Sequence, residues 1–198
     1  MIPPAVEPLL TARRAELRRA LAAGHAIDER ALDDTEYEGI SLALPRLVER
    51  LTWKTFTKTF HRDPKTGELR GWNVRMEQHG VFGPRVPLTK NGKPHTWGHY
   101  RVYSAKGVRL AAPYDMALLI DYGVPSNDFV TRRMRDPLVA VTEGDPSVLL
   151  GVTYLDLGWL RVMTPTYFAL VRRGPLSYVA NGTSGSGASS PGRVSAPT

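Results

Sequence analysis

The chain has no cysteine among its 198 residues. This absence excludes disulfides, thiolate nucleophiles, cysteine-ligated zinc and iron–sulfur clusters. Long hydrophobic runs are also missing, because stretches such as 116–120 and 148–152 are far shorter than the ~20 apolar residues of a membrane-spanning helix. The first ten residues contain no lysine or arginine, which is unlike a signal peptide. These absences predict a cytoplasmic protein with no membrane span.

Several sequence motifs of common enzyme classes are absent as well. The chain has no GxGxxG, GxxxxGK[ST], GxSxG or HExxH pattern, so the dinucleotide-binding, P-loop, α/β-hydrolase and zincin classes lack support. His95 and His99 have i, i+4 spacing, but on an extended strand they would stand ~13 Å apart, too far to share an ion. We therefore expect no metal and no cofactor.

Basic residues are in excess, with 26 Lys+Arg against 19 Asp+Glu and a formal net charge of +7. Such a balance is compatible with nucleic acid, an anionic ligand or an acidic partner. However, no RNA-recognition motif, KH loop, helix-turn-helix or zinc-finger pattern accompanies it. The basic residues are spread along the chain among acidic ones, so solvated charged faces are favoured and a nucleic-acid partner is not expected.

The hydrophobic pattern changes along the chain from helical to alternating. Residues 8–23 have a helical pattern, and Pro45 suits the first turn of a short helix over 46–51. After this point alternating segments are separated by turns rich in glycine and proline, of which the chain has 18 and 16. The expected strands are residues 53–62, 68–78, 99–104, 118–122, 127–134, 138–142, 148–157 and 166–173.

About eight antiparallel strands with tight connections must protect their edges, and a closed barrel or a sandwich does so. We therefore predict a mainly β protein, an antiparallel β-barrel whose N-terminal helix and short helix cover one mouth. Residues 1–29 would form a helical lead and residues 30–180 the barrel. Residues 181–198 contain five serines, four glycines and two prolines, which predicts a disordered tail.

The order of these pieces carries a family resemblance. Residues 35–39 (TEYEG) stand where the family has a Gly-x-Trp-x-Gly strand, with Thr35 for the first glycine, Tyr37 for the tryptophan, and Gly39 kept. Residues 51–54 (LTWK), 149–152 (LLGV) and 167–170 (YFAL) match its later segments. Over roughly residues 30–173 the chain resembles a bacterial family of lipocalin-like barrels built from a GXWXG domain and an uncharacterised C-terminal half. The resemblance implies a lipocalin-like barrel and assigns no catalytic residues.

One candidate site is a strand face formed by His99, Arg101 and Tyr103. The two-residue period of a strand places these side chains on one side of the sheet. Histidine can transfer a proton near neutral pH, arginine can hold a carboxylate or enolate, and tyrosine can donate to an oxyanion. If the face points inward, the three form a polar patch inside the barrel. The alternative is the solvated outer face of the strand.

Asp121 is the best acidic candidate because it follows the apolar stretch 117–120. A carboxyl group there would be partly buried, with a raised pKa suited to a general base. The alternative is that Asp121 caps the turn after its strand, as aspartate at a strand end often does.

Aromatic residues recur at alternating positions of the expected strands. This placement suits a barrel interior large enough for an apolar ligand, and it equally suits a filled core. An anionic group on such a ligand would meet Lys58 or Arg101. The aromatic residues expected to contact the ligand are Trp53, Phe56, Trp72, Trp97, Tyr154 and Phe168.

Two functions follow from these patterns. The first is binding of a small, largely apolar molecule, with or without an anionic group, inside the barrel. The second is a cofactor-independent enzyme, such as an isomerase, cyclase or lyase, in which His99 or Asp121 is the base and Tyr103 or Arg101 the electrophilic partner. If the strand face of His99 points into the barrel, it can serve either function, and if it points to solvent, it has only a surface role.

Overall fold

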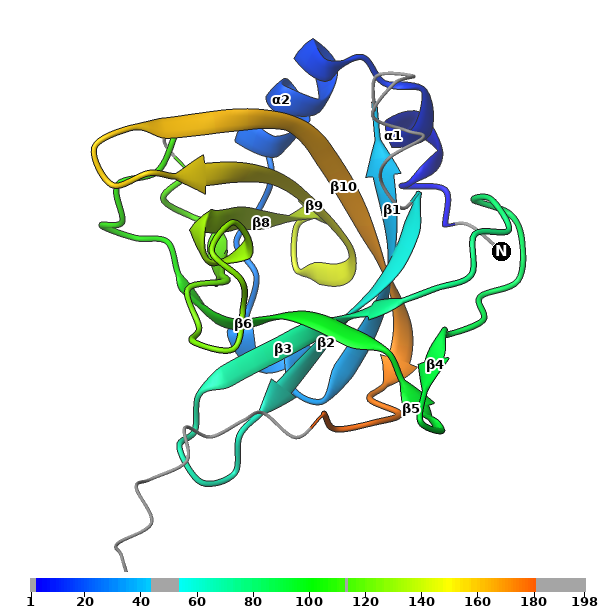
Figure 1. The fold of residues 1–198 in the computed structure, drawn as a ribbon. Helices are drawn as coiled ribbons and strands as arrows, with labels where there is room; N and C mark the ends of the chain where they lie inside the picture. The colour runs from blue at the N-terminus through cyan, green and yellow to red at the C-terminus, as the bar shows by residue number, and fades with distance from the viewer. Residues whose placement is uncertain (1–2, 44–53, 113, 181–198) are drawn as a thin grey trace, which may run out of the picture.

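The structure, a computed structural model, describes residues 3–43, 54–112 and 114–180. Within them eight strands form a closed antiparallel barrel in which each strand pairs with the next, and the last pairs with the first (Figure 1). The predicted fold class, a mainly β antiparallel barrel, is therefore confirmed. The barrel strands are β1 (Thr35–Leu42), β2 (Thr55–Arg62), β3 (Leu69–Arg75), β6 (Thr96–Ser104), β7 (Leu118–Asp121), β8 (Met134–Thr142), β9 (Asp145–Asp156) and β10 (Arg161–Pro175), and a separate hairpin is formed by β4 (Thr89–Lys90) and β5 (Lys93–Pro94).

The membership of the barrel differs from the predicted set of strands. The expected strand at 127–134 is a loop that ends in the 3₁₀ turn η2 (Thr131–Arg133), and β1 takes its place in the barrel. The cause is Asp128, whose Oδ1 accepts the backbone N–H groups of Val130 and Thr131 at 2.9 and 3.0 Å. This pattern fixes a turn where the hydrophobic alternation indicated a strand.

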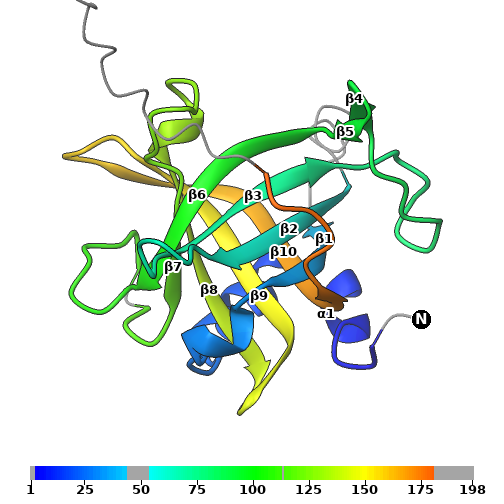
Figure 2. The ribbon, with the colours of Figure 1, turned by 90° about the horizontal axis from the view of Figure 1, so that it is seen from below.

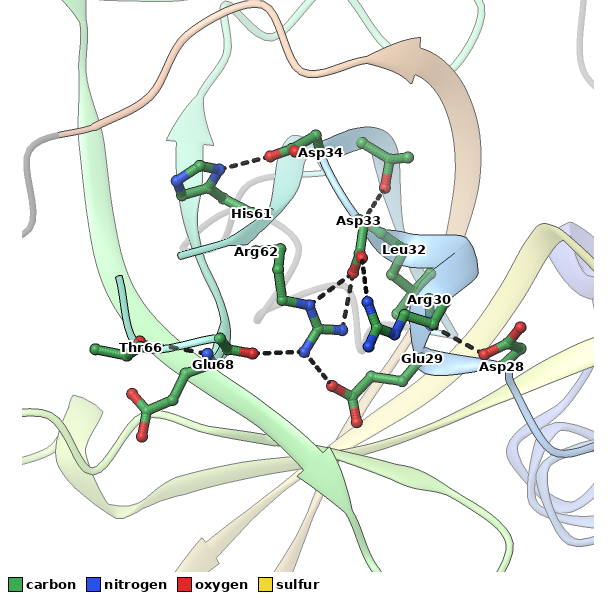
Figure 3. Close-up of polar contacts among 12 residues, drawn as sticks. Asp28, Glu29, Arg30, Leu32, Asp33, Asp34, His61, Arg62, Thr66 and Glu68 are labelled. Atoms are coloured by element: carbon green, nitrogen blue, oxygen red, sulfur yellow. Dashed lines mark hydrogen bonds and ion pairs between the residues drawn. The ribbon is translucent and has the colours of Figure 1, made fainter. Parts of the chain in front are cut away.

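The barrel has one end covered by the chain, which we call the closed end. There the 3₁₀ turn η1 (Glu29–Leu32) precedes β1, and Leu32 is completely buried. Arg62, at the end of β2, holds the turn in place through Glu29 at 2.6 Å and Asp33 at 2.8 Å (Figure 3). Nearby, the ring of His61 contacts the carboxylate of Asp34 at 2.6 Å. The opposite end, where β2, β6, β8 and β10 begin, is the open end.

Apolar side chains fill the interior next to the closed end, a region that we call the closed half. Tyr37, Phe60 and Tyr100 pack edge to face, with ring centroids 5.5 and 6.1 Å apart. Such ring packing adds to the stabilisation from burial itself. The closed half consists of Ile27, Leu32, Tyr37, Phe60, Leu69, Tyr100, Val102, Leu118, Ile120, Leu138, Ala140, Leu149 and Leu170.

The N-terminal segment forms two helices rather than the single helix predicted over 8–23, and they are α1 (Glu7–Thr11) and α2 (Arg14–Ala22). They pack on the outward side chains of β1 and β7–β10, not over a mouth, and Figure 2 shows α1 outside the wall. Gly24 allows this close approach, since a Cβ there would overlap Val139. The predicted short helix over 46–51 lies outside the described residues. No described helix is long and apolar enough to cross a membrane.

The segment after β10 covers another part of the outer wall. Trp72, Val74 and Met76 alternate along the chain around β3 and share one face, which points outward. Leu176, Tyr178 and Ala180 pack over it, which leaves Trp72 completely buried. The disordered tail expected at 181–198 lies outside the described residues and stays a prediction.

Candidate ligand site in the barrel

A cavity of about 300 Å³ occupies the barrel interior towards the open end. Its volume is at the small end of the ~300–1,000 Å³ range of small-molecule pockets. Seven of the eight barrel strands supply side chains to its wall, and Tyr122 follows the eighth, β7. The lining residues are Ser41, Phe56, Lys58, Asn73, Trp97, Tyr122, Met134, Asp136, Thr153, Leu155, Thr164, Thr166 and Phe168.

Two glycines shape the apolar part of the cavity wall. Gly39 lies beneath the ring of Phe56, and Gly151 lies beneath the ring of Phe168. A Cβ at either glycine would overlap the ring, so each ring can lie close against the wall only because its neighbour has no side chain. The two rings meet edge to face with centroids 6.1 Å apart. Gly39, the glycine kept from the TEYEG stretch, therefore positions one side of the cavity.

Lys58 is the buried cation of the cavity, with 2% of its side chain exposed. Its Nζ donates to Asn73 Oδ1 at 3.1 Å and to the hydroxyl of Tyr122, and it lies 3.4 Å from Asp136 Oδ2. A buried charge is stable only when it is paired and hydrogen-bonded, and these three partners meet that need. Lys58, Asn73, Tyr122 and Asp136 form what we call the polar cluster.

Aromatic rings surround the amine of Lys58 on its other sides. The Nζ atom lies 4.8 Å from the ring centroid of Tyr100 and 4.9 Å from that of Tyr122. Phe168 and Phe56 follow at 5.3 and 5.8 Å. Ring faces within about 6 Å attract a cation. The polar cluster is therefore a small ionic site within a mostly apolar wall.

Burial sets the proton affinities in the polar cluster. It lowers the pKa of Lys58, against the attraction of Asp136, and it raises the pKa of Asp136, against Lys58, Thr153 and Tyr122. The two shifts bring the proton affinities of the amine and the carboxyl group towards each other. Burial also raises the pKa of Tyr122 well above its usual value, so the phenol stays protonated and donates to Asp136 Oδ2 at 3.1 Å.

Two details fix the orientation of the polar cluster. The amide of Asn73 donates from Nδ2 to the carbonyl of Gly98 at 3.1 Å, which turns its Oδ1 towards Lys58. Gly98 has φ +53° beside an irregularity in the β3–β6 pairing, which brings its carbonyl within reach. On the other side, Asp136 Oδ1 is buried and accepts no hydrogen bond of good geometry from the described residues. That oxygen retains capacity for a donor.

Some of the predicted ligand contacts lie in this cavity. Phe56, Lys58, Trp97 and Phe168 line it. Trp72 and Tyr154 are buried but are not in its wall. The predicted contact of Arg101 is not found, because Arg101 is exposed on the outer face of β6. Trp53 lies outside the described residues, so its contact stays a prediction.

The predicted catalytic face of β6 points away from the cavity. Tyr100 and Val102 fill the interior, so His99, Arg101 and Tyr103 lie on the outer face. The inward alternative for this face was wrong, because the apolar residues of the strand occupy the core side.

Asp121 also lies on the outer wall. Its Oδ1 accepts the backbone N–H of Gly123 at 2.7 Å, which is the turn-capping role given above as the alternative. The same carboxylate pairs with Arg135 at 3.0 Å and accepts a hydrogen bond from Tyr103 at 2.9 Å. The carboxylate thus serves a surface network, and the carboxyl group that lines the cavity is that of Asp136.

The sequence patterns did not predict three members of the polar cluster, Asn73, Tyr122 and Asp136. Tyr122 follows Asp121 directly and points inward at the end of the apolar stretch. Because proline is uncommon inside a strand, Pro137 indicated a strand boundary, and Asp136 was left outside the expected strand. In the structure β8 continues through Pro137, which lies opposite Leu119. The available signal was the spacing of Asp136 and Leu138, which places a carboxylate on the core side of the strand.

The described residues contain no group of three or more histidine, aspartate or glutamate side chains placed to hold a metal ion.

Comparison with known proteins finds no matching family model, no matching curated protein and no matching solved structure. The resemblance to the GXWXG-domain barrels therefore stays a prediction.

Proposed function

We propose that the barrel binds a small, largely apolar molecule in its cavity, which lies in the part of the interior next to the open end, here called the open half. The observation that supports this proposal is the contrast within the cavity wall. Phe56, Phe168, Met134 and Leu155 supply apolar surface, and the polar cluster supplies a single polar region. A mostly apolar pocket with a few converging polar groups is the usual form of a small-molecule site.

The polar cluster indicates which polar group the ligand would carry. Lys58 is already paired with Asp136, so the pair has no net charge to offer. An added carboxylate would leave one buried negative charge in excess, which is strongly unfavourable. A neutral carbonyl or hydroxyl oxygen can accept a hydrogen bond from the amine without that penalty. Of the two ligand types left open by the sequence, with or without an anionic group, we therefore favour the uncharged one, with a neutral oxygen.

The experiment compares three probes that share a styryl group: cinnamyl alcohol, benzylideneacetone and cinnamate. Calorimetric titration of the wild type should show binding of the alcohol and ketone and weaker binding of the carboxylate. Leu155→Trp, which adds bulk to the cavity wall, should weaken binding of the alcohol by tenfold or more, which corresponds to about 1.4 kcal/mol. Leu157→Trp is the matched control, because Leu157 is 41% exposed and does not line the cavity.

A second cavity variant helps to distinguish a loss of binding from a loss of folding. Thr166→Phe narrows the cavity from the adjoining strand β10 and should have the same effect as Leu155→Trp. Circular dichroism would establish that each variant is folded. Equal affinity of the alcohol for the wild type and both cavity variants would contradict the proposal.

The alternative function, a cofactor-independent acid–base enzyme, is favoured by one observation. A phenol, an amine and a carboxyl group with shifted proton affinities converge in the cavity, as in catalytic acid–base sites. Asp136 or Lys58 would then be the base and Tyr122 the donor. Deuterium exchange at the methyl group of benzylideneacetone, followed by NMR, separates the two functions. Exchange that is faster with wild type than with Tyr122→Phe supports the enzyme, and no acceleration supports a carrier.

A further inference from the structure

We propose that the Lys58 amine forms a reversible imine with a small apolar aldehyde held in the cavity. This inference rests on the proposed function, since the aldehyde must first occupy that cavity. It narrows the ligand from a neutral oxygen compound to a carbonyl compound that reacts with a primary amine. Its basis is a nucleophile at an apolar binding site with a carboxyl group and a phenol beside it.

The position of Lys58 distinguishes it from the other lysines of the described residues. Lys58 is 2% exposed and lines the cavity. Its polar partners and the surrounding rings leave Lys58 in the wall of the cavity, where a bound molecule would lie beside the amine. By contrast, Lys65, Lys90, Lys93 and Lys106 are exposed to solvent. An aldehyde in the cavity would therefore be concentrated next to one amine.

The amine must lose a proton before it can attack a carbonyl, and the polar cluster provides for this step. Burial lowers the pKa of Lys58 and raises that of Asp136. The carboxylate lies 3.4 Å from the amine, so it is positioned to take the proton directly. A desolvated lysine of this kind is the usual form of an imine-forming nucleophile.

The atoms and charges of the reaction balance within the polar cluster. Asp136 takes one proton from the Lys58 ammonium, and the free amine adds to the aldehyde carbon as the C=O π bond breaks. A proton then passes from the nitrogen to the oxygen to give a neutral carbinolamine. The proton on Asp136 returns to the carbinolamine hydroxyl, the C–O bond breaks, and water leaves through the open end. The product is a cationic iminium beside the Asp136 carboxylate, so the net charge of the pair is unchanged. Hydrolysis by the reverse steps releases the aldehyde.

The surroundings suit the iminium product as well as the starting ammonium. Asp136 remains as its counter-ion, and the ring faces of Tyr100, Tyr122, Phe56 and Phe168 lie within 5.8 Å of the nitrogen. Such faces attract a cation whatever its substituents. The Tyr122 phenol is held protonated by burial and lies close enough to hydrogen-bond the departing oxygen.

The experiment traps the imine by reduction. Wild-type protein is incubated with cinnamaldehyde and sodium cyanoborohydride, digested, and the labelled peptides are measured by mass spectrometry. The chain has six lysines, and label on Lys58 should exceed that on the other five together. Lys58→Arg keeps the positive charge beside Asp136 but cannot form an imine, and it should lose this label. Lys106→Arg is the matched control on an exposed lysine and should keep it.

Cinnamyl alcohol separates failure of this inference from failure of the proposed function. If the alcohol binds in the cavity but cinnamaldehyde labels Lys58 no more than the exposed lysines, the imine is overturned and the binding function stands. If the alcohol does not bind and the label is spread evenly, both fail. If the label is confined to Lys58, and Leu155→Trp reduces it while Leu157→Trp does not, both are supported.

Discussion

The two halves of the barrel interior have the same strand alternation but opposite contents. In the closed half, Tyr37, Phe60 and Tyr100 pack edge to face and Leu32 of η1 completes the layer. In the open half, the corresponding inward positions hold the polar cluster and a cavity of about 300 Å³. The comparison shows that a small barrel can use one end of its interior for stability and the other for a site.

The difference arises from what each end must satisfy. At the closed end, Arg62 holds η1 through Glu29 and Asp33, and Leu32 of this turn is completely buried against the apolar layer. Close packing there is favourable because every inward side chain has an apolar neighbour. At the open end, a buried lysine and a buried aspartate pair with one another, and a cavity remains beside them. Four predictions test this contrast.

The largest effect on the free energy of unfolding should come from removing an aromatic ring from the closed half. Phe60→Ala removes a completely buried ring and should lower the free energy of unfolding by about 3–5 kcal/mol. Phe56→Ala is its matched partner on the same strand, but Phe56 already borders the cavity and is partly exposed. It should lower that free energy by only about 1–2 kcal/mol. Urea unfolding of both variants measures the difference, and equal losses would contradict the division into two halves.

Breaking the ion pair of the open half should have the next largest effect. Lys58→Met leaves the Asp136 carboxylate buried without its cation, and should lower the free energy of unfolding by about 3 kcal/mol at neutral pH. The double variant Lys58→Met, Asp136→Leu removes both charges and should recover most of that loss. Urea unfolding of the pair tests this expectation. No recovery in the double variant would show that the packing of Lys58, not its charge, matters.

Alkaline titration should measure the contribution of Tyr37 to the stability of the closed half. Burial raises the pKa of Tyr37 from 10 to about 12, so the folded state holds the phenol proton more tightly than the unfolded chain. The resulting stabilisation is present below pH 10 and is lost as the pH rises towards 12, by about 1.4 kcal/mol per pH unit. Urea unfolding of the wild type and of Tyr37→Phe at pH 9, 10 and 11 measures it. Parallel pH profiles would refute this role for Tyr37.

The smallest effect is expected on the outer wall. His99→Ala removes a side chain on the outer face of β6, and should change the affinity for cinnamyl alcohol by less than about 0.5 kcal/mol. Calorimetric titration under the conditions used for the wild type provides the measurement. A loss of affinity as large as that caused by Leu155→Trp would show that the strand face of His99 contributes to the binding site.

Alternation and turn residues were sufficient to predict the barrel and part of its cavity wall. The alternation around 53–62 placed Phe56 and Lys58 on one side of a strand, and both line the cavity. The same rule failed at 127–134, where the hydrogen bonds of the Asp128 side chain stabilise a turn. Local alternation does not include the competition between a side chain and a backbone ladder for the same N–H groups.

The site residues were only partly predictable for a related reason. Period two shows that His99, Arg101 and Tyr103 share a face, but it does not show which face of the sheet is inside. That choice depended on Tyr100 and Val102, which gain more by burial in the closed half. The partner of Lys58 was equally hidden, because Asp136 lies 78 positions further along the chain and meets it only across the barrel.

The sequence by itself determined the mainly β class, the absence of thiol chemistry and the apolar character of the strands. Each of these depends on composition or on neighbours within a few residues of one another. The tertiary structure alone decided which faces point inward, that β1 closes the barrel against β10, and that Lys58, Asn73, Tyr122 and Asp136 converge. These features depend on contacts between distant segments, whose free energies are set by burial and charge pairing in the closed barrel.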